Sequence, residues 1–130
     1  MKQQATIAAP DLSTRVYPLK GGPGLPPGKG QGCHDLWVLG DADGHVLSGP
    51  ALSGLAGLEL DLRFGDLVLR APGMMRLDIP VDVIEDDEDS CALWHEEGRS
   101  VQLVDEGELA AVWFSRLLGV PVRLLKRLPV

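Results

Sequence analysis

The sequence has few cysteines, few basic side chains and no long apolar run. Cys33 and Cys91 are too few for the disulfide framework of a small secreted domain, which favours a reducing compartment. The 12 basic residues are outnumbered by 19 acidic ones, and the net charge of −7 argues against nucleic acid or an anionic membrane as partner. No apolar run reaches the roughly 20 residues of a membrane span, and residues 1–10 lack a signal-peptide centre. We therefore expect an acidic, cytoplasmic protein with no membrane segment.

Length and composition indicate one folded domain. A chain of 130 residues with 45% hydrophobic and 24% charged residues is within the range of ordinary globular domains. Its 16 glycines and 10 prolines predict many turns and short elements. Residues 1–13 are small and polar, so we interpret them as a flexible lead-in to a domain at 14–130.

Hydrophobic alternation predicts antiparallel strands. An apolar run at 36–39, a DADG turn and a return at 45–48 are typical of a β-hairpin. The next stretch, 58–79, alternates apolar and polar residues with turns at Gly65-Asp66 and Pro72-Gly73, which favours a meander with one wet face. The first turn fits a type II′ geometry. The side chains expected on the core face of the first strand are Leu58, Leu60, Leu62 and Phe64.

One helix is predicted near the C-terminus. Asp105 and Glu108 have the spacing of a capping box, and Gly119 followed by Pro121 marks the helix end. A final short strand is expected at 122–125. The fold class is therefore mainly β: a small antiparallel barrel or bent sheet with one α-helix at about 105–118 and a short strand after it. The apolar residues expected to share the buried helix face are Leu109, Val112, Trp113 and Leu117, with Arg116 inside that stripe.

The common chemical motifs fail on spacing. The glycine-rich loop at 21–32 has Pro23 where a phosphate loop needs its first glycine, and Gly30 where that motif needs serine or threonine. The acidic run at 85–89 (EDDED) lacks the spaced ligands of a calcium loop, so we interpret it as a solvated loop. Nothing here predicts a metal site.

The segment Cys33-His34-Asp35 has residue types that suit thiol chemistry. Adjacent strand residues point to opposite faces, so Cys33 and His34 are poorly placed to bind one zinc ion. Our first interpretation is an inward-packed cysteine beside polar neighbours. A thiol-dependent enzyme or sulfur carrier that uses these three residues stays open as the alternative.

Several motifs occur in an order that resembles a known family. The resemblance is to the MOSC N-terminal β-barrel domain, which precedes a MOSC domain in molybdenum-cofactor sulfurases and amidoxime-reducing proteins. It covers the chain from about Arg15 to Lys126. The matching segments are 16–21 (VYPLKG), 36–39 (LWVL), 41–48 (DADGHVLS), 71–74 (APGM), 77–80 (LDIP), Trp94, 113–115 (WFS) and 118–124 (LGVPVRL).

The resemblance implies a domain that helps to hold the molybdenum cofactor (molybdopterin) and does not catalyse a reaction by itself. It places Lys20 at the anionic end of that cofactor, and the other expected cofactor-binding residues are His34 at the strand entry and Ser48 at the position of the family's hairpin threonine. Asp35 stands where the family has an arginine, and an acid there would repel a phosphate. The metal-binding cysteine of the family belongs to the MOSC domain, so the resemblance assigns no metal ligand to this chain.

The favoured hypothesis is a stand-alone, non-catalytic MOSC N-terminal-like domain. Its expected partner is a separate MOSC-domain protein or a small anionic ligand at a rim formed by Lys20, the 21–32 loop and His34-Asp35. A further alternative is a fragment of a longer MOSC protein, and an exposed apolar patch on the helix or the last strand would favour it, since a missing domain leaves its interface uncovered.

Overall fold

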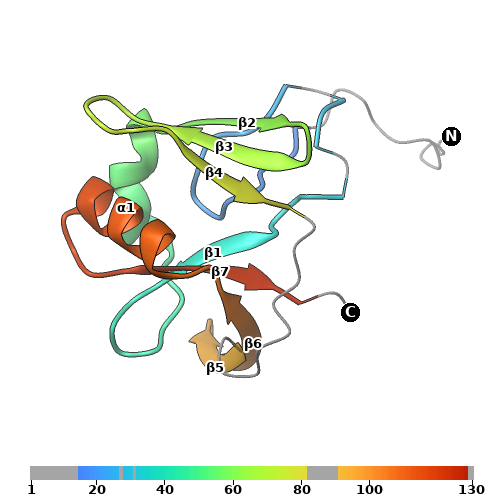
Figure 1. The fold of residues 1–130 in the computed structure, drawn as a ribbon. Coiled ribbons are helices and arrows are strands. Elements are labelled where there is room, and N and C mark those ends of the chain that lie inside the picture. The colour runs from blue at the N-terminus through green and yellow to red at the C-terminus, as the bar shows by residue number, and fades with distance from the viewer. Residues whose placement is uncertain (1–14, 27, 31, 82–90, 129–130) are drawn as a thin grey trace, which may run out of the picture.

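Two antiparallel sheets form the frame of the molecule (Figure 1). The computed structural model describes residues 15–26, 28–30, 32–81 and 91–128. The first sheet, in spatial order, contains β1 (Trp37–Gly40), β7 (Arg123–Arg127), β6 (Arg99–Asp105) and β5 (Cys91–Glu96). The second contains β2 (Glu59–Arg63), β3 (Asp66–Arg70) and β4 (Leu77–Pro80). The helices are the 3₁₀ helix η2 (Gly49–Gly57) and α1 (Glu108–Leu118).

The main core lies between the three-stranded sheet, β1, β7 and the two helices. Strand alternation turns the leucines of β2–β4 inward, and Figure 1 shows α1 at one end of the two sheets. Trp37 and Phe114 are its largest fully buried side chains. Other members are Leu19, Leu39, Leu52, Leu55, Leu67, Leu69, Leu77, Ile79, Ala110, Trp113 and Leu124.

A smaller apolar cluster lies on the other face of the four-stranded sheet. It joins Val38, Val46, Leu103 and Leu125, with Trp94 packed against them. A β-carbon at Gly40 would come within 2.4 Å of the Trp94 ring, so the ring occupies the space that a side chain would need. Glycine at this position is what lets β1 and the β5–β6 hairpin approach.

The return segment of the predicted hairpin connects two sheet edges. Val46 bridges to Gly40 of β1, as the sequence predicted, and His45 bridges to His95 of β5. The backbone N–H of Val46 donates to the His95 carbonyl at 2.8 Å. His95 itself belongs to β5, so this contact joins the hairpin segment to the edge of the four-stranded sheet.

The mainly β fold with a C-terminal helix followed by a strand is confirmed. The two sheets are not closed into a barrel. No helix in the described part of the chain is long and apolar enough to cross a membrane. The acidic run at 85–89 and the lead-in at 1–13 fall outside the described residues.

The helix begins later than the sequence predicted. Asp105 is the last residue of β6, paired with Leu125, and its carboxylate accepts hydrogen bonds from Arg123 at 2.7 and 3.0 Å. It therefore cannot cap the helix, and Gly107 is the N-cap at a φ of +105°. The predicted end is confirmed, because Gly119 adopts the left-handed conformation with its N–H bonded to Ser115.

The buried face of α1 also differs from the prediction. Leu109 is 75% exposed and Val112 is 61% exposed, whereas Trp113 and Phe114 are buried. Both faces of this helix carry apolar residues, so periodicity alone could not choose between them. The two aromatic rings bury the larger area and decide the orientation. Arg116 then lies on the outward face and needs no acidic partner in the core.

The β2–β3 turn is one residue earlier than predicted. Arg63 pairs with Asp66, which leaves Phe64 and Gly65 as the two-residue loop. Their φ angles of +52° and +82° are those of a type I′ turn rather than type II′. Phe64 is consequently fully exposed and does not join the core face.

Replacement of Phe64 by asparagine is expected to stabilise the protein. A bulky side chain at positive φ is strained, whereas asparagine before glycine is the preferred type I′ pair. We expect Phe64→Asn to raise the free energy of unfolding by about 1 kcal/mol in urea denaturation followed by circular dichroism. Leu93→Asn, at a 70% exposed strand position, serves as control and should not stabilise. Equal effects of the two changes would contradict this explanation.

Candidate functional site

The predicted site residue Lys20 lies at the centre of an ionic cluster. The preceding residue, Leu19, forms a parallel bridge with Trp37, and the Lys20 N–H donates to the Trp37 carbonyl at 3.0 Å. This pairing places the Lys20 ammonium over the end of β5. Its Nζ donates to Glu96 Oε2 at 2.8 Å and lies 3.6 Å from Glu97.

Glu96 is the buried member of the cluster. Only 3% of the residue is exposed, and its carboxylate accepts hydrogen bonds from Arg127 Nη1 at 2.8 Å and Nη2 at 2.7 Å. The bidentate Arg127 contact is the main cause that lowers the Glu96 pKa to about 2, and Lys20 adds to it against the opposing effect of burial. Glu96 is therefore ionised at any physiological pH.

Arg127 also holds Asp35. Its Nε donates to the Asp35 carbonyl at 2.9 Å, and its guanidinium lies 3.4 Å from the Asp35 carboxylate. Asp35 adopts a φ of +54°, a conformation that aspartate tolerates better than most residues. Asp35 thus faces an arginine supplied by β7.

These groups line a cavity of about 380 Å³, which we name the Lys20 cavity. Its lining residues are Lys20, Asp35, Glu96, Glu97, Arg99 and Arg127. Three are positive and three are negative, so their formal charges cancel.

The Lys20 cavity does not fit the anionic end of molybdopterin. The Lys20 ammonium is already held by a carboxylate at 2.8 Å, and the Arg127 guanidinium by both oxygens of the same group. A phosphate entering here would also meet the carboxylates of Asp35 and Glu97, which carry the same sign of charge and repel it. We therefore assign the Lys20–Glu96–Arg127 network a structural role.

The other two predicted residues lie outside this cavity. The His34 Nδ1 accepts the backbone N–H of Tyr17 at 3.1 Å, and its ring meets the Tyr17 ring edge-on. Ser48 is exposed and precedes η2 without a side-chain capping bond. The structure therefore does not bring Lys20, His34 and Ser48 together as one binding site.

The alternative of a thiol-dependent enzyme needs Asp35 and His34 beside Cys33, but both side chains bond to other groups. Asp35 pairs with Arg127, and among the described residues it forms no ion pair with His34. A nucleophilic cysteine needs an imidazole that is itself oriented by a third group. Cys33 is half-buried, next to residues that do not supply that arrangement. Within the described residues, no three histidine, cysteine or acidic side chains gather as they would around a metal ion.

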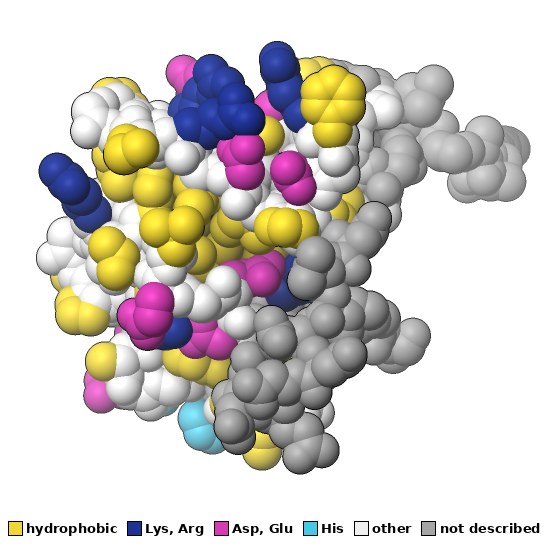
Figure 2. All heavy atoms as spheres, in the orientation of Figure 1, with side chains coloured by type: hydrophobic (Ala, Val, Ile, Leu, Met, Phe, Trp, Pro, Cys, Tyr) yellow, Lys and Arg dark blue, Asp and Glu magenta, His cyan; other side chains and the backbone are white. Residues whose placement is uncertain are grey.

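A second cavity, of about 310 Å³, lies beside α1, and we name it the α1 groove. Its walls are mostly apolar and come from α1, the 41–42 turn and the start of β7. The lining residues are Asp41, Ala42, Glu108, Ala111, Val112, Ser115, Pro121, Val122 and Arg123. Figure 2 shows apolar side chains at the molecular surface in the region of α1.

The rim of the α1 groove is held by ion pairs. Arg123 donates to Asp105 at 2.7 Å and to Glu108 at 2.7 Å, and these carboxylates raise the pKa of its guanidinium. The Ser115 hydroxyl donates to the Val122 carbonyl and accepts its N–H, which fastens the helix to the segment before β7. The groove is thus a preformed feature of the fold.

Comparison with known proteins places the chain in a family. No protein-family model and no curated protein matches the sequence. The solution structure of a structural-genomics target protein from Bordetella bronchiseptica is similar, with 40% sequence identity over 90% of each chain and a TM-score of 0.75. The chain belongs to the family of this Bordetella protein. The description of that protein names no activity, so the match establishes fold and kinship and transfers no function.

Loss of Arg127 should destabilise the fold strongly. Arg127→Met leaves the buried Glu96 carboxylate with one cation instead of two, and breaking a buried pair costs about 3 kcal/mol. Urea denaturation measures this loss. The matched control is Arg76→Met, which removes an exposed arginine paired with Asp78 at 2.7 Å and should change stability far less. Similar losses in both variants would contradict the structural role.

The network also predicts an acid-sensitive stability. The folded pKa of Glu96, about 2, lies below the ordinary value of 4.5, so its ionised form stabilises the fold fully above pH 4.5. That stabilisation, about 3 kcal/mol, is lost as the pH falls towards 2. The difference in unfolding free energy between the wild type and Glu96→Gln should therefore shrink from about pH 5 to pH 2. A difference in unfolding free energy that does not vary with pH would refute the stabilising role of ionised Glu96.

Proposed function

We propose that the chain is a non-catalytic binding domain of the MOSC N-terminal type, whose partner is a separate MOSC-domain protein seated in the α1 groove. The observation that carries the proposal is the outward apolar face of α1. Val112 is 61% exposed and lines the preformed groove, and Leu109, on the same helix, is 75% exposed. Large apolar side chains gathered beside a groove are typical of protein interfaces.

The Lys20 cavity supports the protein partner over the cofactor. Its cations are neutralised by carboxylates of the same chain, so an anion would have to displace an internal ion pair. A protein partner could bind in the α1 groove without displacing an internal ion pair. A partner that covers Val112 and Leu109 would remove apolar surface from water at about 25 cal/mol per Å².

The charges at the rim indicate what the partner should carry. Asp41 and Glu108 lie at the edge of the groove, and the only basic side chain among its described lining residues, Arg123, is paired with Asp105 and Glu108. An apolar ridge flanked by lysine or arginine would complement this edge. The overall charge of −7 also favours a positively charged partner.

The test is binding to a MOSC-domain protein encoded in the same genome, measured by calorimetry on the purified pair. Val112→Asp places a charge on the apolar wall of the groove and should weaken binding about tenfold or more. Leu93→Asp is the matched control, because Leu93 is 70% exposed on β5, outside the groove, and should leave affinity unchanged.

Both variants should keep the wild-type circular dichroism spectrum, since both side chains are mostly exposed. Failure of the wild type to bind any MOSC protein of that genome would overturn the proposed partner. Equal weakening by the two variants would overturn the proposed surface.

A further inference from the structure

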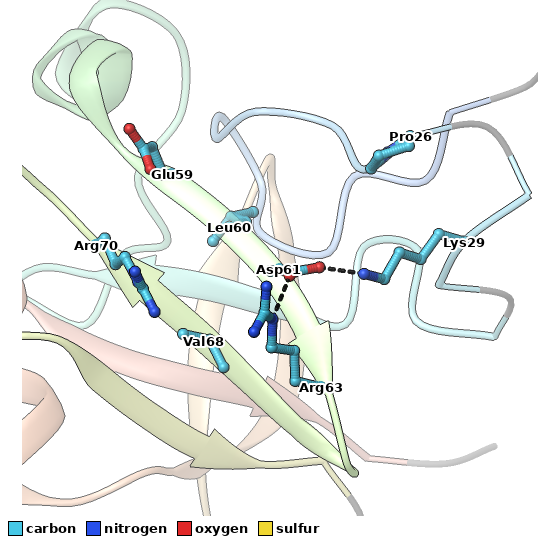
Figure 3. Close-up of a pocket in the computed structure, with 8 residues that line it drawn as sticks. All are labelled: Pro26, Lys29, Glu59, Leu60, Asp61, Arg63, Val68 and Arg70. Atoms are coloured by element: carbon cyan, nitrogen blue, oxygen red, sulfur yellow. Dashed lines mark hydrogen bonds and ion pairs between the residues drawn. The ribbon is translucent and has the colours of Figure 1, made fainter.

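A groove of about 370 Å³ lies on the outer face of the three-stranded sheet, away from the α1 groove and the Lys20 cavity. We name it the Arg70 groove, and Figure 3 shows its lining side chains. Strand residues supply one wall and floor, and the glycine-rich loop supplies Pro26 and Lys29. The remaining lining residues are Glu59, Leu60, Asp61, Arg63, Val68 and Arg70.

Val68 gives the groove an apolar floor. It alternates with Leu67 and Leu69, which both belong to the main core, so its side chain lies on the opposite face of the sheet. Only 3% of Val68 is exposed, although this face looks towards solvent. The long side chains of Arg63 and Arg70 lie on either side of it in Figure 3.

One side of the groove is organised by Asp61. Its carboxylate accepts hydrogen bonds from Lys29 Nζ, from Arg63 Nε at 2.8 Å and from the Leu62 N–H at 2.9 Å. Lys29 is thereby drawn from the loop onto β2. The two terminal nitrogens of Arg63 donate to no described residue, so they remain available on the groove side of the pair.

The other side of the groove carries Arg70. Arg70 stands across from Glu59 in the β2–β3 register, yet it forms no hydrogen bond or ion pair with any described residue. Its charge acts through space on Asp78, whose pKa is lowered mainly by Arg76 and to a lesser degree by Arg70. Its guanidinium is therefore free to bind a ligand.

The charge balance distinguishes this groove from the Lys20 cavity. Three cationic side chains line it against two carboxylates, which leaves a local excess of positive charge on a protein of net charge −7. In the Lys20 cavity the charges cancel, and Glu96 occupies the donors of both cations that touch it. Unused guanidinium donors over an apolar floor suit a compact oxyanion, which arginine binds through paired N–H groups.

We propose that the Arg70 groove binds a compact oxyanion of the phosphate class, held by the guanidinium groups of Arg63 and Arg70 with Lys29 at its edge. Lys29 is held by a carboxylate of the same chain, so it contributes charge rather than a necessary bond. The ligand's organic part would lie over Val68. This site is independent of the partner proposed for the α1 groove.

The experiment is a titration of the ¹⁵N-labelled protein with sodium phosphate at constant ionic strength, followed by two-dimensional amide spectra. We expect saturable shifts confined to the backbone around β2, β3 and Lys29. Arg70→Gln should weaken the fitted affinity about tenfold or more, since a charge-assisted contact is lost. Arg99→Gln is the matched control: Arg99 is an exposed arginine of the Lys20 cavity, and its loss removes the same charge.

Three results would overturn the proposal. Shifts that grow linearly without saturation would show general screening of surface charge. Saturable shifts around Lys20 that Arg99→Gln abolishes would place the anion in the other cavity. Equal weakening by both variants would mean that net charge, and not the Arg70 groove, sets the affinity. A parallel titration with sodium acetate separates a phosphate-class site from one that accepts any carboxylate.

Discussion

The arrangement of this domain depends on one carboxylate that is taken out of water. Glu96 ends a strand whose other residues are only partly buried or exposed, so the β5–β6 hairpin attaches to the rest of the fold through the small cluster around Leu103 and Trp94 and through this carboxylate. Lys20 approaches from the N-terminal segment, and Arg127 approaches from the end of β7. An unpaired buried charge is costly, so the N-terminal segment, β5 and β7 favour the one arrangement in which Glu96 pairs with both cations. The position of the hairpin is thus set by these ion pairs together with its hydrophobic contacts.

The fold was largely predictable wherever alternation or turn chemistry is unambiguous. The alternating leucines identified β2–β4, and Gly119 identified the end of α1. Predictions failed where two local solutions compete. Asp105 suits a helix cap as well as a strand end, and Arg123, 18 residues away, decides for the strand. The same applies to Phe64, which fits an alternating strand but is drawn into the turn by the register of its neighbours.

The candidate sites were less predictable, because their partners come from distant parts of the chain. Lys20 was predicted to bind a cofactor, but nothing in the sequence indicated that Glu96, 76 residues away, is buried and pairs with that lysine. Arg127 was missed, since a basic residue at the end of a short strand has no distinctive pattern. The sequence did not predict the α1 groove. It gave only the statement that an exposed apolar patch on the helix would indicate a missing interface, and much of the helix face that was expected to be buried is exposed.

The contact between Gly40 and Trp94 couples two positions that are far apart in the sequence. The indole ring stands where a β-carbon at Gly40 would be, and β1 is buried along its whole length, so the strand has no room to move aside. A larger residue in place of Gly40 would need a smaller one in place of Trp94, and the end of the Leu125 side chain, 2.8 Å from the same β-carbon, would have to shift as well. In other members of the family, the residues at these two positions should therefore change together or not at all. Wherever the β5–β6 hairpin is kept, we expect this pair to be better conserved than any surface residue.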